Sequence, residues 1–214
     1  MNYNNYYFID SQYFPVVNCF NYSYKSKYII LCECDNFEKM TFFNRCVVAG
    51  SNGLINLSVP VVHGREQKGK YNSVRISYAQ NWQMNHWRTI ISCYRKSPFF
   101  NYYVDELEMI FLKRFDFLFD LNLSILHWIN ELIEHPAEIK VLSAPFDRDD
   151  FPGTFDLRKK WLPKNFQAES DFIRYTQVFE DRIGFQPNIS ILDLLFNTGP
   201  MAKVLLQNAE TKKK

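Results

Sequence analysis

The chain has 214 residues, of which 47% are hydrophobic and 22% charged, which is ordinary for one globular domain and excludes intrinsic disorder. Its 25 Lys and Arg against 23 Asp and Glu give a net charge of +2, which indicates no basic face for nucleic acid. No apolar stretch approaches the roughly 20 residues that span a bilayer, and the start has no signal-peptide pattern, so we expect a cytoplasmic protein without a membrane span.

The first 80 residues predict mainly sheet-forming segments. Residues 6–9 and 28–32 are apolar runs of strand length, and residues 16–24 between them have the pattern of a helix that Pro15 can open. A strand, a helix and a strand within about 30 residues indicate a βαβ unit, so we expect the two strands to pair in parallel.

A hairpin is predicted next. Residues 41–49 and 54–62 are rich in β-branched and aromatic side chains, and a turn cluster at residues 50–53 separates them. The polar, cationic residues 63–70 should then form an exposed loop, and residues 74–76 a brief strand.

The centre of the chain, from residue 81 to residue 135, predicts a helical layer. Asn81 is a suitable N-cap for an aromatic helix that Ser97 and Pro98 stop. Two more helices with regular apolar stripes are expected over residues 104–114 and 118–133.

The rest of the chain predicts one more strand, a long loop and C-terminal helices. Residues 138–142 form a strand candidate, and the aperiodic residues 143–165 should be a surface loop and the best candidate for a mobile lid. Ser190 and Asp193 have capping-box spacing, and Gly199 supplies a left-handed helix end. A last helix is expected over residues 201–207, in a C-terminal segment that extends from residue 166 to residue 208.

These elements predict an α/β fold in a single domain over residues 1–214. It should have an N-terminal βαβ unit and a mixed sheet, a central helical layer and C-terminal helices. The sequence shows no internal repeat and no interdomain linker.

The five cysteines have no framework spacing, so reduced thiols are expected. Cys32 and Cys34 occupy alternate positions of a strand, which favours two small core side chains over half of a metal site. The four histidines stand apart from any Cys or acid at ligand spacing, so no metal site is expected.

No strong catalytic motif is present, and Gly-x-Gly-x-x-Gly, the Walker loop, Gly-x-Ser-x-Gly and His-Glu-x-x-His are all absent. The aromatic fraction of 17% fits either an aromatic core or an aromatic-lined ligand groove. His86 is either an acid–base group or a satisfied histidine at the core edge. Asp10 follows the first strand, where α/β folds bind ligands, or else belongs to a solvated turn that caps the next helix. Arg45 lies in a predicted strand and needs a carboxylate partner or an anionic ligand.

The βαβ unit places residues 10–13 beside residues 33–35 at the carboxyl edge of the sheet, where a crevice is expected. If the aromatic helix packs on that sheet, its histidine approaches the same crevice, and a nearby arginine can bind the phosphate of an anionic ligand such as a nucleotide sugar. We therefore predict one polar pocket with the 143–165 loop as a partial cover. It should hold Asp10, Gln12, Arg45 and His86. The catalytic candidates of the chain are His86 and Asp10, and its substrate-binding candidates are Gln12, Tyr13, Asn44 and Arg45.

Several blocks of sequence, taken together, resemble one family. They are Tyr13-Phe14-Pro15, Asn44-Arg45-Cys46-Val47-Val48, Trp82-x-x-x-His86-Trp87-Arg88, Tyr94-x-Lys96-Ser97-Pro98-Phe99-Phe100, Tyr175-x-Gln177-x-Phe179 and Phe185-x-Pro187-Asn188-Ile189-Ser190-Ile191-Leu192-Asp193. From about residue 7 to residue 205 the chain is similar to the WbqC-like family of bacterial proteins.

This resemblance implies a role in assembling O-antigen or another surface polysaccharide, and no reaction is attached to the family itself. One reading is an enzyme, for example a transferase that modifies a nucleotide-linked amino sugar; the other is a non-catalytic binding or assembly protein of the same pathway. Many members carry Gln-Pro-x-Tyr-Phe-Pro after the first strand, often with a His before it. Here the stretch from Asp10 to Pro15 reads Asp-Ser-Gln-Tyr-Phe-Pro, so the chain lacks that His-Gln pair.

Overall fold

The computed structural model describes residues 6–64, 67–145 and 150–209. Its strands are β1 (Tyr6–Phe8), β2 (Tyr28–Cys32), β3 (Arg45–Gly50), β4 (Gly53–Ser58), β5 (Glu138–Leu142) and β6 (Thr154–Asp156). Its helices are α1 (Val17–Ser23), the short 3₁₀ helix η2 (Tyr71–Ser73), α2 (Trp82–Tyr94), α3 (Phe100–Leu112), α4 (Leu118–Leu132), α5 (Glu180–Ile183), α6 (Ile191–Thr198) and α7 (Met201–Asn208). Among these helices none is both long and apolar enough to cross a membrane.

Four strands form a parallel sheet in the order β5-β2-β1-β6. Tyr6 of β1 lies opposite Tyr28 of β2 on one side and Thr154 of β6 on the other. The predicted βαβ unit is therefore confirmed, with α1 as its crossover helix. Ile29, Ile30 and Leu31 of β2 are all fully buried, which is typical of a parallel strand covered on both faces.

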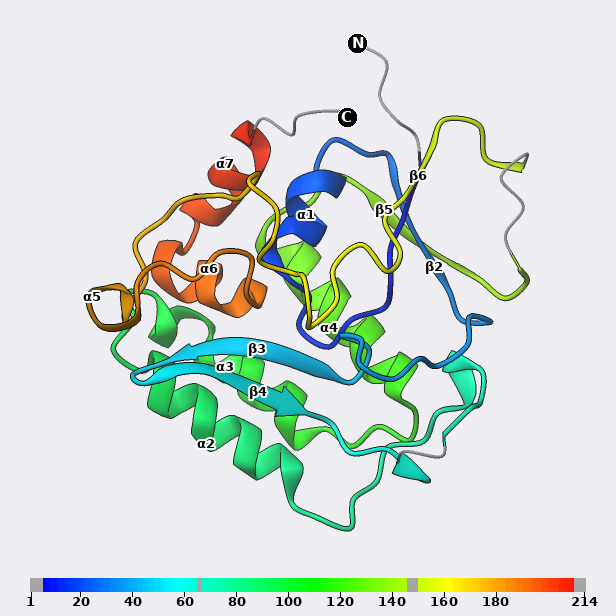
Figure 1. Ribbon diagram of the computed structural model, residues 1–214, viewed down its shortest axis with the longest axis horizontal. Helices are drawn as coiled ribbons and strands as arrows, with labels where there is room; N and C mark the ends of the chain where they lie inside the picture. The colour runs from blue at the N-terminus through cyan, green and yellow to red at the C-terminus, as the bar shows by residue number, and fades with distance from the viewer. Residues whose placement is uncertain (1–5, 65–66, 146–149, 210–214) are drawn as a thin grey trace.

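The predicted hairpin is present as a second sheet of β3 and β4, paired from Arg45 opposite Ser58 to Gly50 opposite Gly53. The first sheet is thus parallel throughout, and the antiparallel pair stands apart from it. β3 contacts both α2 and α6, and Figure 1 shows the hairpin between these two helices. The backbone N–H of Ala49 donates to the hydroxyl of Tyr94 at 3.0 Å, which joins β3 to the end of α2.

The central and C-terminal helices lie close to their predicted positions. Asn81 caps α2, because its side chain accepts from the backbone N–H of Met84, and α3 begins at Phe100, earlier than predicted. Ser190 caps α6 by accepting from the N–H of Leu192, but Asp193 does not reciprocate, because the Ser190 N–H donates to the carbonyl of Val47 instead.

One local prediction is corrected, and another is only partly covered by the described residues. Residues 74–76 form no strand, because Arg75 and Ile76 make only isolated bridges, to Phe117 and Val61. In the predicted exposed loop at 63–70, residues 65–66 lie outside the described part of the chain, whereas His63 and Lys68 are exposed as expected.

The larger correction concerns the predicted surface loop at residues 143–165. Residues 146–149 lie outside the described residues, but the segment beyond them contains β6, which pairs with β1 in the sheet. Leu157 and Trp161 after this strand are buried in the core. The segment is therefore part of the fold, because it adds a strand to the sheet and buries its apolar side chains in the core.

Aromatic side chains fill much of the core. The largest fully buried side chains include Trp161, Tyr13, Tyr71, Tyr94, Phe8, Phe14, Phe20 and Phe196. The high aromatic content is therefore largely a property of the core.

Candidate functional site

A crevice of about 350 Å³ lies at the carboxyl ends of three neighbouring parallel strands. Asp10 follows β1, Asp35 follows β2, and Asp156 ends β6. The chain runs from β1 to β2 and β5 on one side of the sheet and returns to place β6 on the other side of β1. The crevice therefore includes the point where the strand order reverses, which is where open α/β sheets bind ligands.

Asp10 is the most perturbed acid of this crevice. Its side chain is only 8% exposed, and burial raises the pKa of its carboxyl to about 6. Its Oδ2 accepts a hydrogen bond of 2.6 Å from the backbone N–H of Lys159, which partly opposes that rise. The hydrogen bond ties the end of β1 to the segment after β6.

The backbone at Lys159 is unusual, because its φ of +60° lies in the left-handed region although the residue is not glycine. The same residue donates its backbone N–H to Asp10, and such strained residues concentrate at functional sites.

The other charged groups of the crevice form ion pairs with one another. Arg158 donates to Asp156 at 2.7 Å and to Asp35 at 3.2 Å, which raises the pKa of its guanidinium. Lys159 forms an ion pair with Glu38 through its side chain. Asp10 takes no part in these ion pairs, since its one hydrogen bond among the described residues comes from a backbone amide. It is therefore the carboxylate that can exchange a proton with a ligand.

A buried hydrogen-bond network fixes the loop that carries Asp10. The hydroxyl of Tyr71 donates to the carbonyl of Ser11 at 2.9 Å. The side-chain amide of Asn122, on α4, donates to the Tyr71 hydroxyl at 2.6 Å and to the carbonyl of Phe43 at 2.8 Å. Phe43 lines the crevice, so the same hydrogen-bond network positions both Phe43 and the loop of Asp10.

A crevice lies where residues 10–13 and 33–35 were expected to meet, lined there by Asp10 and Asp35, but the structure does not bring the predicted site side chains together in it. Of the six site candidates, only Asp10 lines it. Gln12 is buried and accepts from the N–H of Val16 at the start of α1. Asn44 donates to the carbonyl of Val59 within the hairpin region.

His86 and Tyr13 meet each other in the core. The Tyr13 hydroxyl lies 2.9 Å from His86 Nδ1, and the imidazole also makes a hydrogen bond with the backbone of Ser58. Burial lowers the pKa of His86 to about 4, so the imidazole is neutral at physiological pH. Since α2 packs on the hairpin, His86 is directed to that second sheet and not to the crevice.

Arg45 also remains outside the crevice. Its guanidinium contacts the sulfur of Met40 at 3.9 Å, and it has no carboxylate partner within the described residues. The carboxylate partner expected for it is therefore not found among the described residues.

The prediction of reduced Cys32 and Cys34 thiols is also corrected, because the structure joins the two sulfur atoms in a disulfide. Their alternate positions at the end of β2 bring the side chains together on one face. With Asp35 they form a cluster whose ligand atoms lie within 4.8 Å of one another. A metal would require the two thiolates, so the disulfide and a metal at this cluster exclude each other.

The lining residues that sequence reasoning missed are Asn36, Glu38, Phe43, Asp156, Arg158 and Lys159. Asp156 ends β6 and Arg158 and Lys159 follow it, and this strand has only three residues and shows no alternation of its own. The available signal was the turn at Gly153 before a β-branched and an aromatic residue.

The WbqC-like protein family model matches residues 10–150, more than half of the chain. This chain belongs to the WbqC-like protein family. No curated protein and no solved structure matches it. The matched segment begins at Asp10 and includes Asp35, whereas β6 and the basic residues after it lie beyond its end. The WbqC-like segment therefore supplies one wall of the crevice, and the following segment supplies the other.

Proposed function

We propose that this WbqC-like protein is an enzyme of surface-polysaccharide assembly that transfers a group to the amine of a nucleotide-linked amino sugar. The observation that carries the proposal is Asp10, a buried carboxyl with a pKa of about 6 that lies free of ion pairs at the strand-order reversal. A base with a pKa near the working pH combines a large ionised fraction with useful proton affinity.

The charge of the crevice supports an amine as the reacting group. Four carboxyl groups line it against two cations, and both cations are already paired. A phosphate would meet net negative charge there, whereas an ammonium group would be attracted. The amine end of the amino sugar therefore enters the crevice, and its phosphates remain outside.

The proposed step balances with Asp10 as its only base. The ammonium first loses one proton to solvent, and the neutral amine then attacks the donor's activated carbon while the Asp10 carboxylate takes the second proton from its nitrogen. The new bond to nitrogen forms as the bond to the donor's leaving group breaks, and the leaving group keeps that electron pair. Asp10 then returns its proton to solvent or to the leaving group.

The test compares amine and hydroxyl ligands on the same scaffold. Nucleotide-linked amino sugars should raise the melting temperature of the protein more than the corresponding nucleotide-linked sugars without the amine. Donors should then be screened by mass spectrometry of the sugar, with acyl-CoA, folates and amino acids as the panel. Asp10→Asn should lose turnover, while the matched control Asp181→Asn, exposed on α5, should retain it.

Two outcomes separate the proposal from a non-catalytic binding protein. Turnover that survives Asp10→Asn would remove Asp10 from the chemistry. Specific binding of the amino sugar without conversion by any donor of the panel would favour the binding or assembly role in the same pathway.

A further inference from the structure

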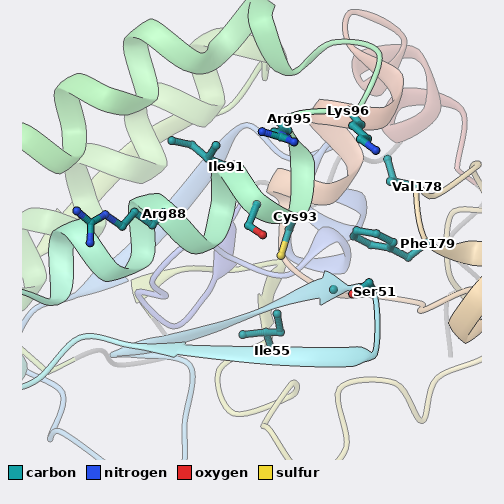
Figure 2. A pocket seen from close by; sticks show the side chains of 11 residues that line it. Ser51, Ile55, Arg88, Ile91, Cys93, Arg95, Lys96, Val178 and Phe179 are labelled. Atoms are coloured by element: carbon teal, nitrogen blue, oxygen red, sulfur yellow. The ribbon is translucent and has the colours of Figure 1, made fainter.

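A second and larger cavity, of about 560 Å³, lies at the opposite end of the hairpin and shares no residue with the crevice. It is an open cavity lined by residues from α2 and its end, from the hairpin of β3 and β4, and from just before α5. Figure 2 shows α2 on one side and the hairpin on the other, with Phe179 entering between them. Its volume is within the range of small-molecule sites.

The charged side chains of this cavity are all cationic. Arg88, Arg95 and Lys96 line it, and no Asp or Glu does. All three are exposed, and within the described residues none forms an ion pair. This contrasts with the crevice, where Arg158 and Lys159 are held by carboxylates.

The helix explains why these cations share one cavity. Arg88 and Arg95 are seven residues apart on α2, which places them on the same face, and Lys96 follows at its end. Part of their charge compensates the partial negative charge at the helix C-terminus, but that compensation needs no cavity and does not account for Arg88, near the middle of α2.

The rest of the lining is apolar and aromatic. Ile55 from the hairpin, Ile91 from α2 and the ring of Phe179 form the apolar part. The hydroxyl of Ser51 lies at the hairpin turn. Cys93 also faces the cavity, and burial raises the pKa of its thiol to about 11, so it adds no negative charge at neutral pH.

We propose that this cavity binds a phosphate ester of the nucleotide class. The phosphate groups lie beside Arg95 and Lys96, with Arg88 farther along α2, and a flat ring packs against Phe179 and the apolar floor. Guanidinium groups bind phosphate oxygens in pairs, and an aromatic side chain offers a stacking partner for a base. The concave shape favours a small ligand over a polymer, and the proposal is independent of the transfer reaction at Asp10.

The experiment measures binding by titration calorimetry with ADP, pyrophosphate and adenosine as probes. ADP should bind more tightly than pyrophosphate and than adenosine, because only ADP engages both the cations and the ring. Its affinity should fall in high salt, since the phosphate contacts are exposed to screening.

The decisive variant is the double substitution Arg95→Gln with Lys96→Gln, which should weaken ADP binding roughly tenfold or more. Its matched control is Lys113→Gln with Arg114→Gln, an exposed basic pair after α3 that removes the same charge elsewhere. Phe179→Leu should weaken ADP and leave pyrophosphate unchanged. The melting temperatures of the free variants show that each remains folded.

Three results would overturn the proposal. No binding of ADP by the folded protein rejects the site. Equal affinity for pyrophosphate and ADP rejects recognition of the ring. Equal losses in both double variants, with a single-stranded oligonucleotide binding more tightly than ADP, assign the charge to diffuse attraction of a polymer.

Discussion

At the scale of single residues, the Asp10 carboxyl is both buried and able to ionise near neutral pH, and its burial opposes its ionisation. Its carboxylate is almost buried and accepts one backbone hydrogen bond, so its ionised form is costly to hold in the folded protein. A group whose ionisation weakens the fold is retained where its chemistry is needed, which is the usual conflict between stability and activity at a functional site.

Asp10→Asn should therefore stabilise the protein above pH 6 while abolishing the proposed activity. The folded-state pKa of about 6 exceeds the ordinary value of 3.8, so the stabilising protonation is complete below about pH 4 and lost as the pH rises through 6. Asparagine keeps an acceptor for the Lys159 N–H and removes the charge, which should raise the free energy of unfolding by roughly 1–3 kcal/mol at pH 8. Urea unfolding at pH 8 and pH 4 measures this.

The gain should vanish at pH 4, where Asp10 is already protonated. Asp181→Asn, on the exposed side of α5, should change stability at neither pH. A loss of stability at pH 8 in Asp10→Asn would instead identify the carboxylate as a structural ion.

At the scale of elements, the helix ends carry specific energies. Ser190 is buried, and its hydroxyl accepts from the N–H of Leu192 at the start of α6. Ser190→Ala should lower the free energy of unfolding by about 1 kcal/mol, because a buried backbone donor loses its partner. Ser124→Ala, inside α4, should have little effect, and equal losses in the two chemical denaturation curves would contradict the capping role.

Gly199 ends the same helix for two reasons, its φ of +54° and the ring of Phe99, which a Cβ at this position would overlap. Gly199→Ala should therefore cost roughly 2–4 kcal/mol, as the sum of backbone strain and overpacking. Gly184 ends α5 with a φ of +71° but has open space around it, so Gly184→Ala should cost only about 1–2 kcal/mol. Equal melting temperatures of the two variants would show that Phe99 moves away without cost.

Elements with a local signal were predictable from sequence. β2 and β5 match their predicted bounds because the apolar run of β2 and the β-branched Ile139 and Val141 of β5 are visible without any knowledge of neighbours. β6 was missed because three residues show no period, and only pairing with β1 makes them a strand.

The candidate site was likewise predictable from the sequence only in part. Asp10 and Asp35 were placed together by a general property of parallel strands, which end at one edge of the sheet. His86 and Arg45 were misplaced because the packing partner of α2 is decided by tertiary contacts, and the apolar stripe of a helix does not say which sheet it will cover.

At the scale of the whole molecule, two kinds of buried titratable group have opposite effects on how stability depends on pH. Burial raises the pKa of Asp10 and Asp193 to about 6, and it lowers the pKa of His86 and His135 to about 4. Between about pH 4 and 6 the two acids make stability fall as the pH rises, while the two histidines make it rise. The net dependence from these four groups should be small.

His86→Gln should expose this balance. It removes one contribution that rises with pH, so the stability of the variant relative to wild type should decline from pH 4 to pH 6.5, by roughly 3 kcal/mol at most. Urea midpoints at several pH values measure the difference. His127→Gln, exposed on α4, serves as the control, and curves for His86→Gln and wild type that stay parallel would contradict a neutral buried imidazole.

The hydrogen bond between Asp10 and Lys159 joins residues that are 149 positions apart. A ribosome must therefore synthesise the hairpin, the central helices and β5 before the second wall of the crevice exists. The first strand, its crossover helix and β2 can associate early, because their contacts are close in sequence. On a nascent chain Asp10 stays open to water during this time, and ligand-binding competence is among the last properties that the folding protein acquires.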